Sequence, residues 1–198
     1  MSPRARRALP PVSLRPQPVP RSDRVNQIVA AARQLVETEG APALTMRRLG
    51  DRLGIKAPSL YKHVAGRDAV IAQLVDDTLF DTGERMHAAV SGPDRDDPAG
   101  GPIRSLLVAY REFGRGHPNL YRLVTSGHLP RAGLTPGLED WAGEPFYRAT
   151  ADPYRAQALW AFAHGTLILE IDGRFVPGSD LDLTWRAGAR AFTSAAGT

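Results

Sequence analysis

Residues 56–63 carry side chains that can bind the phosphates and base edges of DNA. They read Lys-Ala-Pro-Ser-Leu-Tyr-Lys-His, which combines cations, hydroxyls and an imidazole with small residues that allow a close backbone approach. Such donors are the ones that proteins use on phosphate oxygens and on base edges. Leu60 and Val64 would form the inward side of the same helix. The pattern therefore predicts a helix that presents its polar side to DNA.

The preceding residues predict a second short helix that ends in a tight turn. Thr45 can cap a helix that begins at Met46, because its hydroxyl can accept from N–H groups two or three residues further on. Met46, Leu49 and Leu53 recur at helical spacing and form one apolar stripe. Gly54 then suits the left-handed position at which helices often end.

The connection between the two helices completes a recognisable unit. Ile55 would anchor the turn in the core, and Pro58 is tolerated because first-turn N–H groups lack partners within the helix. Two short helices around a Gly turn predict a helix-turn-helix motif, in which early residues of the second helix meet base edges. An ordinary helical hairpin is the alternative interpretation, because any Gly-linked helix pair can imitate the spacing.

Residues 24–75 resemble the N-terminal domain of the TetR family of one-component transcriptional regulators. The run Pro-Ser-Leu-Tyr-Lys-His-Val at 58–64 is especially similar to the tetracycline-repressor type. Further along, residues 117–123 and 160–175 are similar to the WHG-type C-terminal domain of some TetR relatives. The family resemblance implies an all-α fold, with a three-helix DNA-binding domain followed by a helical ligand-binding and dimerisation domain.

The resemblance also implies roles for individual residues. Arg47 would reach a base, residues 57–59 would lie against base edges and a thymine methyl, and Tyr61, His63 and Arg67 would hold phosphates. Lys62 is expected to be a contact without an assigned base. The complete set of candidate DNA-binding residues is Thr45, Arg47, Lys56, Ala57, Pro58, Ser59, Tyr61, Lys62, His63 and Arg67.

Composition and charge agree with a DNA-binding protein. The 198 residues include no cysteine, and the longest nearly apolar run, residues 156–169, is shorter than the roughly 20 residues that a membrane span needs. No secretory signal is evident, so we expect cytoplasmic residence and no membrane partner. Residues 1–68 carry a net charge of +8 and residues 69–198 one of −4. A basic end favours a polyanion, while an acidic remainder keeps DNA off the other surfaces.

Three segments follow from these patterns. Residues 1–22 hold six prolines and five arginines without helical period, which predicts a disordered basic arm. Its arginines, among them Arg15 and Arg21, could contact DNA, or the arm could be a solvated leader. Residues 23–68 are the expected helix-turn-helix domain. Residues 69–198 are the expected effector-binding and dimerisation domain, with helices near 67–90, 102–115, 118–125, 136–149, 153–172 and 180–195.

The last two predicted helices suit a homodimer interface. Helix 153–172 is apolar on nearly every side, so it must be enclosed, and Leu181, Trp185 and Phe192 give helix 180–195 a second apolar face. Two-fold pairing would place the DNA-binding motifs in successive major grooves, about 34–36 Å apart or a multiple of that, and would select an inverted repeat.

The family resemblance further implies a small-molecule effector held in the C-terminal domain. Mixed aromatic and polar side chains suit such a pocket, although a place in the plain core is the alternative for each of them. The candidate ligand-binding residues are Tyr110, Phe113, His117, Tyr121, Phe146, Trp160 and His164. Tetracycline itself is not expected, because Gly83 stands where the tetracycline repressors have a drug-contacting histidine.

Other functional classes have little support in the sequence. Gly-rich phosphate loops, the His-Glu-x-x-His motif and the Gly-x-Ser-x-Gly motif do not occur, so we expect no enzyme. His87 and Asp81 lack a convincing third ligand, so we expect no metal and no cofactor. The sequence therefore predicts a repressor that binds double-stranded DNA as a homodimer and is released by an effector. A ligand-independent or architectural DNA-binding protein with a purely dimerising body is the alternative.

Overall fold

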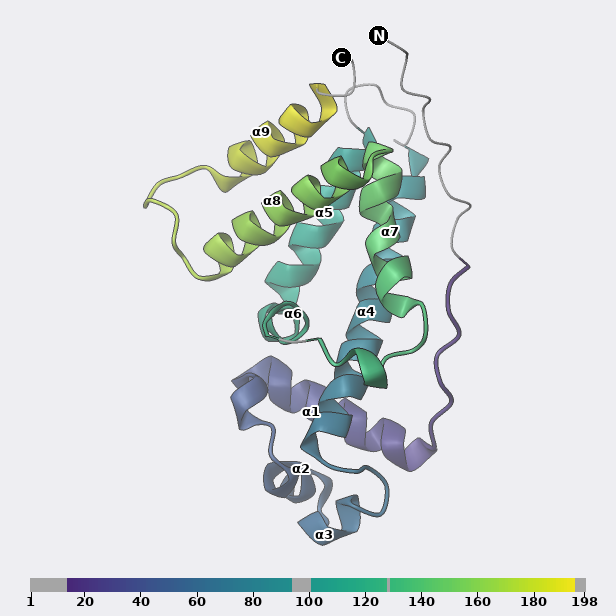
Figure 1. Cartoon of the computed structure of the whole chain (residues 1–198). Helices are drawn as coiled ribbons and strands as arrows, with labels where there is room; N and C mark the ends of the chain where they lie inside the picture. Colours follow the sequence, from purple (N-terminus) through teal and green to yellow (C-terminus); the bar gives the residue numbers. More distant parts are fainter. Residues whose placement is uncertain (1–13, 94–100, 128, 195–198) are drawn as a thin grey trace.

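The computed structural model describes residues 14–93, 101–127 and 129–194, and the regular secondary structure in this part of the chain is all helical. The head, at the lower end of Figure 1, comprises α1 (Asp23–Glu39), α2 (Met46–Leu53) and α3 (Ala57–Leu60). The long helix α4 (Arg67–Ser91) runs from the head into the body. The body is completed by α5 (Gly101–Gly116), α6 (Pro118–Thr125), α7 (Leu138–Thr150), α8 (Pro153–Ile171) and α9 (Leu181–Ser194). Two short 3-10 turns, η1 (Ala41–Ala43) and η3 (Arg131–Gly133), lie in the connections.

The helices α1, α2 and α8 begin where capping side chains occur in the sequence. The Ser22 hydroxyl accepts from the Val25 N–H, and the Thr45 hydroxyl accepts from the Arg48 N–H at 3.2 Å. Asp152 caps α8 by accepting from two first-turn N–H groups. Gly54 ends α2 in the left-handed region, with φ 67°. The all-α prediction is confirmed, and residues 166–171, which could pass for a strand by composition, are helical.

The second helix of the DNA-binding motif is shorter than its apolar pattern indicates. Helix α3 ends at Leu60, and residues 61–63 form turns. The Val64 N–H still bonds the Leu60 carbonyl at 3.0 Å, and both side chains are buried as predicted. The inward side of the motif is therefore retained by a turn that continues the helix direction.

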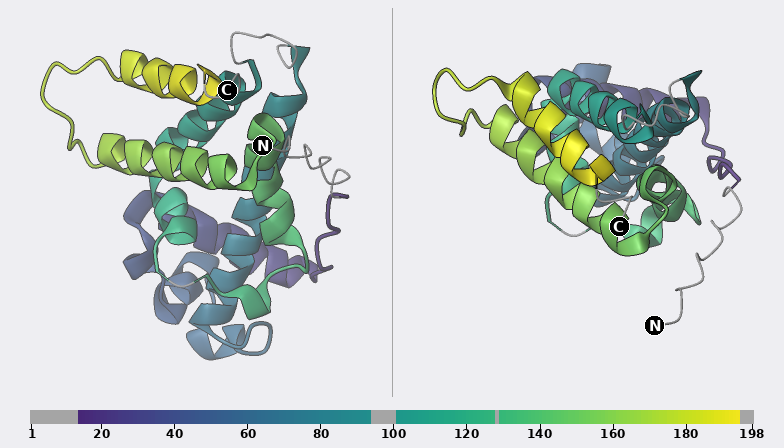
Figure 2. Two further views of the ribbon diagram at one scale, coloured as in Figure 1. Left: turned by 45° about the horizontal axis from the view of Figure 1, so that its top comes forward. Right: turned by 90° about the horizontal axis from the view of Figure 1, so that it is seen from above.

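The head and the body have separate apolar cores that are joined by α4 and α6. The head core contains Leu35, Leu49 and Leu60, and it also contains Leu74 from α4 and Leu120 from α6. The body core is built mainly from α5, α8 and α9. Figure 2 shows α8 and α9 lying side by side at the far end of the molecule from the head. A movement of α4 or α6 would therefore change the packing of both the head and the body.

Helix α7 packs directly on α4 because α4 has no side chain at Gly83. A Cβ built at Gly83 would overlap the ring of Trp141. His87, one turn further on, stacks on the same ring with centroids 4.7 Å apart, and its Nε2 lies 2.9 Å from the Trp141 carbonyl oxygen. Gly83, a possible weak point in the predicted helix, is thus a packing site. His87 faces Trp141, and Asp81 is paired with Arg33 of α1 at 2.7 Å.

The end of the predicted disordered arm is ordered against the body, which corrects that prediction for residues 14–22. This segment is extended and runs along α4, away from the tip of the head (Figure 1). Arg15 pairs with Glu84 at 2.5 Å and lies over the Phe80 ring, and Arg21 pairs with Asp77 at 2.8 Å. Both arginines are thereby held on the body instead of facing DNA. Arg4, Arg6 and Arg7 lie outside the described residues, as does most of the predicted loop 93–102.

None of the helices in the described ranges is both long and apolar enough to cross a membrane.

Candidate nucleic-acid interface and body cavity

The angle between α2 and α3 depends on a glycine that the sequence analysis did not single out. Gly50 is buried in α2, and a Cβ there would lie 2.7 Å from the carbonyl oxygen of Ile55. The two helices therefore meet backbone to backbone. The signal for this contact was present in the sequence as a Gly inside an amphipathic helix, which usually has a packing reason.

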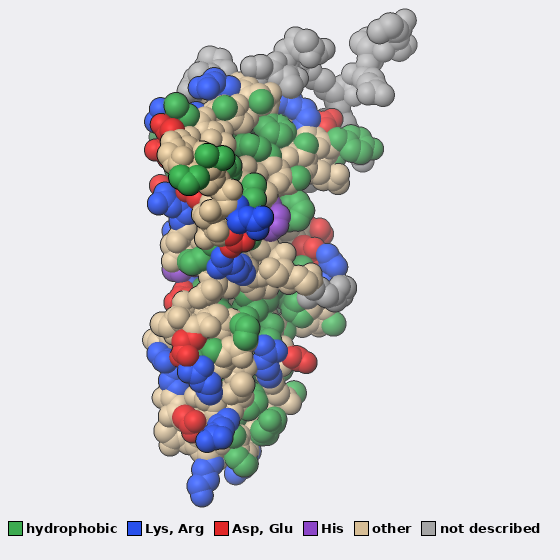
Figure 3. All heavy atoms as spheres, turned by 90° about the vertical axis from the view of Figure 1, so that its left-hand side faces the viewer, with side chains coloured by type: hydrophobic (Ala, Val, Ile, Leu, Met, Phe, Trp, Pro, Cys, Tyr) green, Lys and Arg blue, Asp and Glu red, His purple; other side chains and the backbone are tan. Residues whose placement is uncertain are grey.

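The two helices present their predicted polar side to solvent at the tip of the head. Arg47, Lys56, Lys62 and His63 are exposed, and the Tyr61 side chain is 56% exposed although it is aromatic. Basic side chains gather at the lower end of the molecule in Figure 3. Thr45 and Pro58 are also exposed, and the small residues between them leave the backbone accessible. The structure therefore brings nine of the ten candidate DNA-binding residues, 45, 47, 56–59 and 61–63, onto one surface.

The arginines of α2 differ in the hydrogen bonds and ion pairs that they form within the protein. Arg48 pairs with Glu39 at 2.6 Å, and Arg52 donates to the side chain of Gln34 at 3.3 Å. Among the described residues, Arg47 has no hydrogen bond or ion pair. Its guanidinium is therefore the one on α2 that can bind DNA without first breaking a contact within the protein.

Arg67 occupies a different environment from the phosphate contact that the family resemblance implied. Its Nε donates to the Leu44 carbonyl at 2.7 Å, and a terminal nitrogen donates to the Ala41 carbonyl at 3.1 Å. These bonds tie the start of α4 to the η1 turn in front of α2. Arg67 therefore positions the motif with two of its donors. Its side chain is still 42% exposed, and its role as a phosphate ligand stays a prediction.

A cavity of about 360 Å³ opens in the body between α4, α5, α6, α7 and α8. Five of the seven candidate ligand-binding residues line it: Tyr110, Phe113, Tyr121, Phe146 and Trp160. The cavity is also lined by residues that were not predicted from the sequence, such as Thr82, Met86, Thr125 and Gln157. Helical periodicity can assign these residues to the core or to the surface, but it cannot show that they line a cavity. The volume lies at the small end of the range for ligand pockets.

His164 and two tyrosines form a hydrogen-bonded chain at one wall of the cavity. The Tyr110 and Tyr121 hydroxyls lie 2.9 Å apart, and Tyr121 lies 2.7 Å from Nδ1 of His164. Burial raises the pKa of Tyr110 to about 12 and also raises the pKa of Tyr121. Burial lowers the pKa of His164. All three groups therefore remain uncharged near neutral pH, and His164 supports the wall without lining the cavity itself.

His117 also lies outside the cavity lining, because it faces the head. Its Nδ1 is 2.9 Å from a carboxylate oxygen of Glu37 in α1, and the Asn119 amide donates to the Glu37 carbonyl at the same distance. Both residues begin α6, the helix that carries Tyr121 of the cavity wall. His117 is thus corrected from a ligand candidate to part of a contact between head and body.

A buried carboxylate holds the segment that closes the cavity on the α7 side. Asp76 of α4 is 9% exposed and accepts from the Thr135 backbone N–H at 2.6 Å and from its hydroxyl at 3.0 Å. Thr135 lies between Leu129 and Glu139, both of which line the cavity. Periodicity could not reveal this tie, because the two partners are far apart in the sequence.

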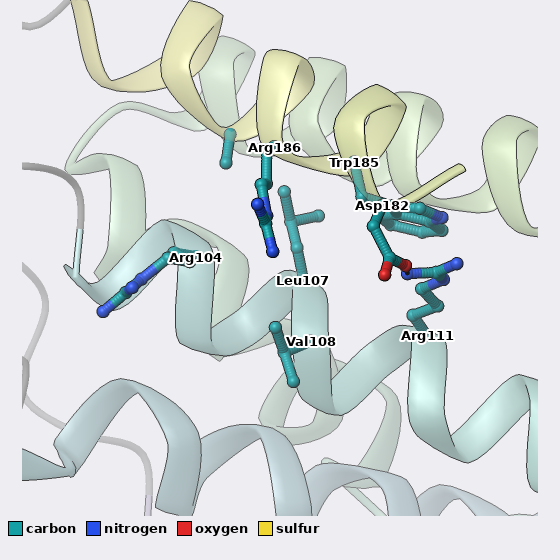
Figure 4. Close-up of a pocket in the computed structure, with 8 residues that line it drawn as sticks. Arg104, Leu107, Val108, Arg111, Asp182, Trp185 and Arg186 are labelled. Carbon is teal, nitrogen blue, oxygen red and sulfur yellow. Dashed lines mark hydrogen bonds and ion pairs between the residues drawn. The ribbon is translucent and has the colours of Figure 1, made fainter. Parts of the chain in front are cut away.

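A second, smaller groove of about 230 Å³ lies between α5 and α9 (Figure 4). In this view Asp182 of α9 points toward Arg111 of α5, and Trp185 lies behind them. Arg111 pairs with Asp182 at 2.5 Å and with Glu170 of α8 at 2.8 Å, and the Trp185 indole donates to Glu170. Arg111 and Glu170 thus join α5, α8 and α9 beneath the groove.

Apolar side chains remain exposed on the outer face of α8 and α9. Leu169 on α8 is 42% exposed and Leu183 on α9 is 53% exposed. Trp160 is also 49% exposed, but it belongs to the cavity lining on the other side of α8. The single chain therefore leaves one side of α8 uncovered, although the sequence indicates a helix that is enclosed.

Two family descriptions match successive parts of the chain. Residues 28–74 match the bacterial regulatory proteins of the tetR family, and residues 103–192 match the tetracyclin repressor-like C-terminal domain. An uncharacterized HTH-type transcriptional regulator of Mycobacterium tuberculosis is 29% identical over 161 residues, which cover 74% of this chain and 69% of that protein. Further curated relatives are matched over less than half of their own length.

Solved structures share the fold across most of the chain. A protein of unknown function from Rhodococcus sp. RHA1 has a TM-score of 0.72 at 18% identity, covering 90% of this chain and 98% of that one. A TetR variant from Acinetobacter baumannii in complex with minocycline has a TM-score of 0.58 at 17% identity, covering 85% of this chain and 93% of that one. At these identities the likeness describes the fold.

Proposed function

The chain belongs to the TetR family of bacterial regulatory proteins, and from that premise we propose that it is a transcriptional repressor released from DNA by a small-molecule effector. One observation carries the proposal. A surface of DNA donors on α2 and α3 and a cavity in the body are connected by the same two helices, because α4 and α6 enter both the head core and the cavity lining. Such a protein would act in the cytoplasm.

The head would bind the major groove through the surface around Tyr61. Arg47 reads a base edge, and the short α3 lies against bases with residues 57–59. Tyr61 and His63 hold phosphates, and Lys62 adds a cation at the rim of the contact. Thr45 and Lys56 stand at the starts of the two helices, where backbone N–H groups face the DNA. Arg67 supports this surface from within the head.

Two copies would pair through α8 and α9. The exposed apolar side chains of these helices, together with the small residues Ala158, Ala161 and Gly165 on α8, would form the contact. Because a two-fold axis presents the same surface on both subunits, the two heads would occupy equivalent positions on an inverted repeat. The paired helices α8 and α9 would then be enclosed, as their apolar sequences predict.

An effector in the cavity would act on the head through α6. Tyr121 lines the cavity, and His117 and Asn119 bond Glu37 of α1 at the start of the same helix. Leu120, which lies between Asn119 and Tyr121 in α6, is fully buried in the head core. A ligand that binds one position of α6 more tightly shifts the population toward that position, and a change from 1:99 to 99:1 needs about 10⁴-fold preference. The cavity is the feature that favours this proposal over a purely dimerising body.

The proposal is tested by selecting DNA from a random pool with the full-length protein and sequencing what is bound. We expect an inverted repeat whose half-sites are separated by one helical turn or a multiple of it. A titration of the selected duplex, followed by fluorescence anisotropy, then serves for a screen of compounds that dissociate the complex. Enrichment of unrelated or asymmetric sequences would contradict the two-fold mode of binding.

A further inference from the structure

The polar groups of the body cavity restrict the kind of molecule that can fill it. We infer that the cavity takes an uncharged aromatic compound that carries a hydroxyl donor, because its lining offers aromatic faces and hydrogen-bond acceptors but no compensating charge. This inference rests on the proposed function in treating the cavity as the effector site. It adds the chemical class of the effector, which follows from the lining residues alone.

The charge of the cavity argues against an anionic ligand. Lysine, arginine and histidine do not occur among the described residues that line it. The single acidic lining residue is Glu139, and Arg131 outside the lining donates to both of its carboxylate oxygens at 2.7 Å. The hydrogen bond from Arg131 lowers the pKa of Glu139, so this group stays ionised and paired. A carboxylate or phosphate would have to leave water without a counter-charge, which is costly.

A cationic ligand gains little from the same arrangement. The charge of Glu139 is already balanced by Arg131 in a two-bond pair at the edge of the cavity. An entering ammonium group would have to break that pair before it could use the carboxylate. The lining as a whole is therefore neutral, and a neutral ligand pays no charge-desolvation cost on entry.

The hydrogen-bonding groups of the cavity are mainly acceptors. The Thr125 hydroxyl donates to the Tyr121 carbonyl at 2.7 Å, and the Thr82 hydroxyl donates to the Thr78 carbonyl within α4. Each threonine has thus used its single proton on its own helix, so its hydroxyl oxygen can only accept a further hydrogen bond. Gln157 also lines the cavity, and its amide, with one acceptor oxygen and two N–H donors, has no hydrogen-bond partner among the described residues. A ligand O–H can satisfy these acceptors.

The aromatic lining determines which apolar part of a ligand the cavity favours. Phe113, Phe146 and Trp160 stand in the wall, and the tyrosine hydroxyls are occupied by each other and by His164. Flat rings gain both apolar burial and ring-to-ring contacts from such a wall. With about 360 Å³ to fill, a bicyclic or tricyclic compound fits better than a long chain.

Three probes of matched shape test this inference by calorimetry on the full-length protein at neutral pH. They are 2-naphthol, 2-methoxynaphthalene, which lacks the donor, and 2-naphthoate, which is an anion. We expect 2-naphthol to bind about fivefold more tightly than the methyl ether and naphthoate to bind more weakly than either. Equal binding of naphthol and its ether, tighter binding of naphthoate, or binding of none of the probes would overturn the inference.

Three variants assign the preference to the named acceptors. Thr125→Val and Gln157→Leu each reduce the preference for naphthol over its ether. Thr38→Val is the matched control, because the Thr38 hydroxyl also donates to its own helix, at 2.9 Å from the Gln34 carbonyl, but lies in α1 outside the cavity. The control must retain the wild-type preference, and thermal unfolding verifies that each variant is folded. An unchanged preference in both cavity variants would overturn the acceptor argument.

DNA binding is measured separately with the selected duplex, so that failure of this inference and failure of the proposed function can be told apart. If naphthol binds with the expected preference while the DNA complex persists, the ligand class stands and effector release fails. If the protein binds its duplex but ignores all three probes, the ligand class fails and DNA binding is untouched.

Discussion

Arg47 and Arg48 are neighbours on α2, yet only Arg47 is available to DNA without a competing contact, because Arg48 is paired with Glu39. We therefore expect Arg47→Ala to cost about 1–3 kcal/mol at a single base pair and to relax specificity there. The measurement is binding to a panel of operator duplexes, each altered at one position. Arg48→Ala is the matched control and should leave the specificity profile unchanged. A loss of the same size on every duplex would contradict the assignment of Arg47 to a base.

Tyr61 and His63 should behave differently from Arg47, because they are assigned to the DNA backbone. Tyr61→Phe and His63→Ala are each expected to weaken all duplexes of the panel by a similar factor, since phosphate contacts carry no direct sequence information. The same panel measures this. A loss confined to one base pair would reassign the residue to base recognition.

His164 makes stability depend on pH with a definite sign. Burial lowers its pKa in the folded protein, so the unfolded chain takes up a proton first as the pH falls. Its contribution is therefore present above the unfolded pKa of about 6.5 and is lost below it. We expect the free energy of unfolding in urea to fall between about pH 7.5 and pH 5.5, and to fall less in His164→Gln. Because the other histidines are common to both proteins, equal slopes would contradict this origin.

At the scale of the helices, Gly83 decides how closely α7 approaches α4. Gly83→Ala would push the Trp141 ring off α4, and we expect a loss of about 1–3 kcal/mol in the free energy of unfolding. Gly143→Ala is the matched control on α7, because a Cβ there meets nothing within 4 Å. That control should stabilise the helix by about 0.5–1 kcal/mol. Chemical denaturation of the two variants checks both signs.

Helix positions could be predicted closely from the sequence, whereas the contacts between helices could not. Ser22, Thr45, Gly54 and Asp152 are local signals, because each acts on backbone groups only a few residues away. The tie between Asp76 and Thr135 spans 59 positions and has no local signal. The length of α3 was also overestimated, because Leu60 and Val64 keep helical spacing through a turn that is not helix.

The residues of the candidate sites also divide into those that the sequence could predict and those that depend on contacts in the fold. The exposed donors of the head could be predicted, because an amphipathic pattern identifies the side that must face outward. Two of the seven cavity candidates, His117 and His164, support the neighbouring structure instead of lining the cavity. Residue type suggested a ligand for both, but only the fold decides that Glu37 and Tyr121 are their partners. For Arg67, too, residue type could not indicate that two of its donors bind backbone carbonyls inside the head.

At the scale of the whole molecule, the charges of the arm and of the head should contribute unequally to DNA binding. Arg15 and Arg21 are paired with Glu84 and Asp77 on the body. We therefore expect the double substitution Arg15→Ala, Arg21→Ala to leave the salt dependence of operator affinity unchanged. Lys62→Ala should reduce the slope by about 1. Anisotropy titrations at several salt concentrations measure both slopes, and a flatter slope in the arm variant would return these arginines to the DNA interface.

The continuous helix α4 would convert a small movement in the body into a larger one at the tip of the head. Its 25 residues extend over about 37 Å at about 1.5 Å per residue. Pivoted at its body end, a tilt of about 5° carries the other end through about 3 Å, close to the spacing of about 3.4 Å between stacked base pairs. In the proposed dimer a two-fold axis would impose the equivalent tilt on the opposite subunit, so the misfit between the two reading surfaces and their half-sites would double. An adjustment too small to unpack any side chain would then be enough to put the dimer out of step with its operator.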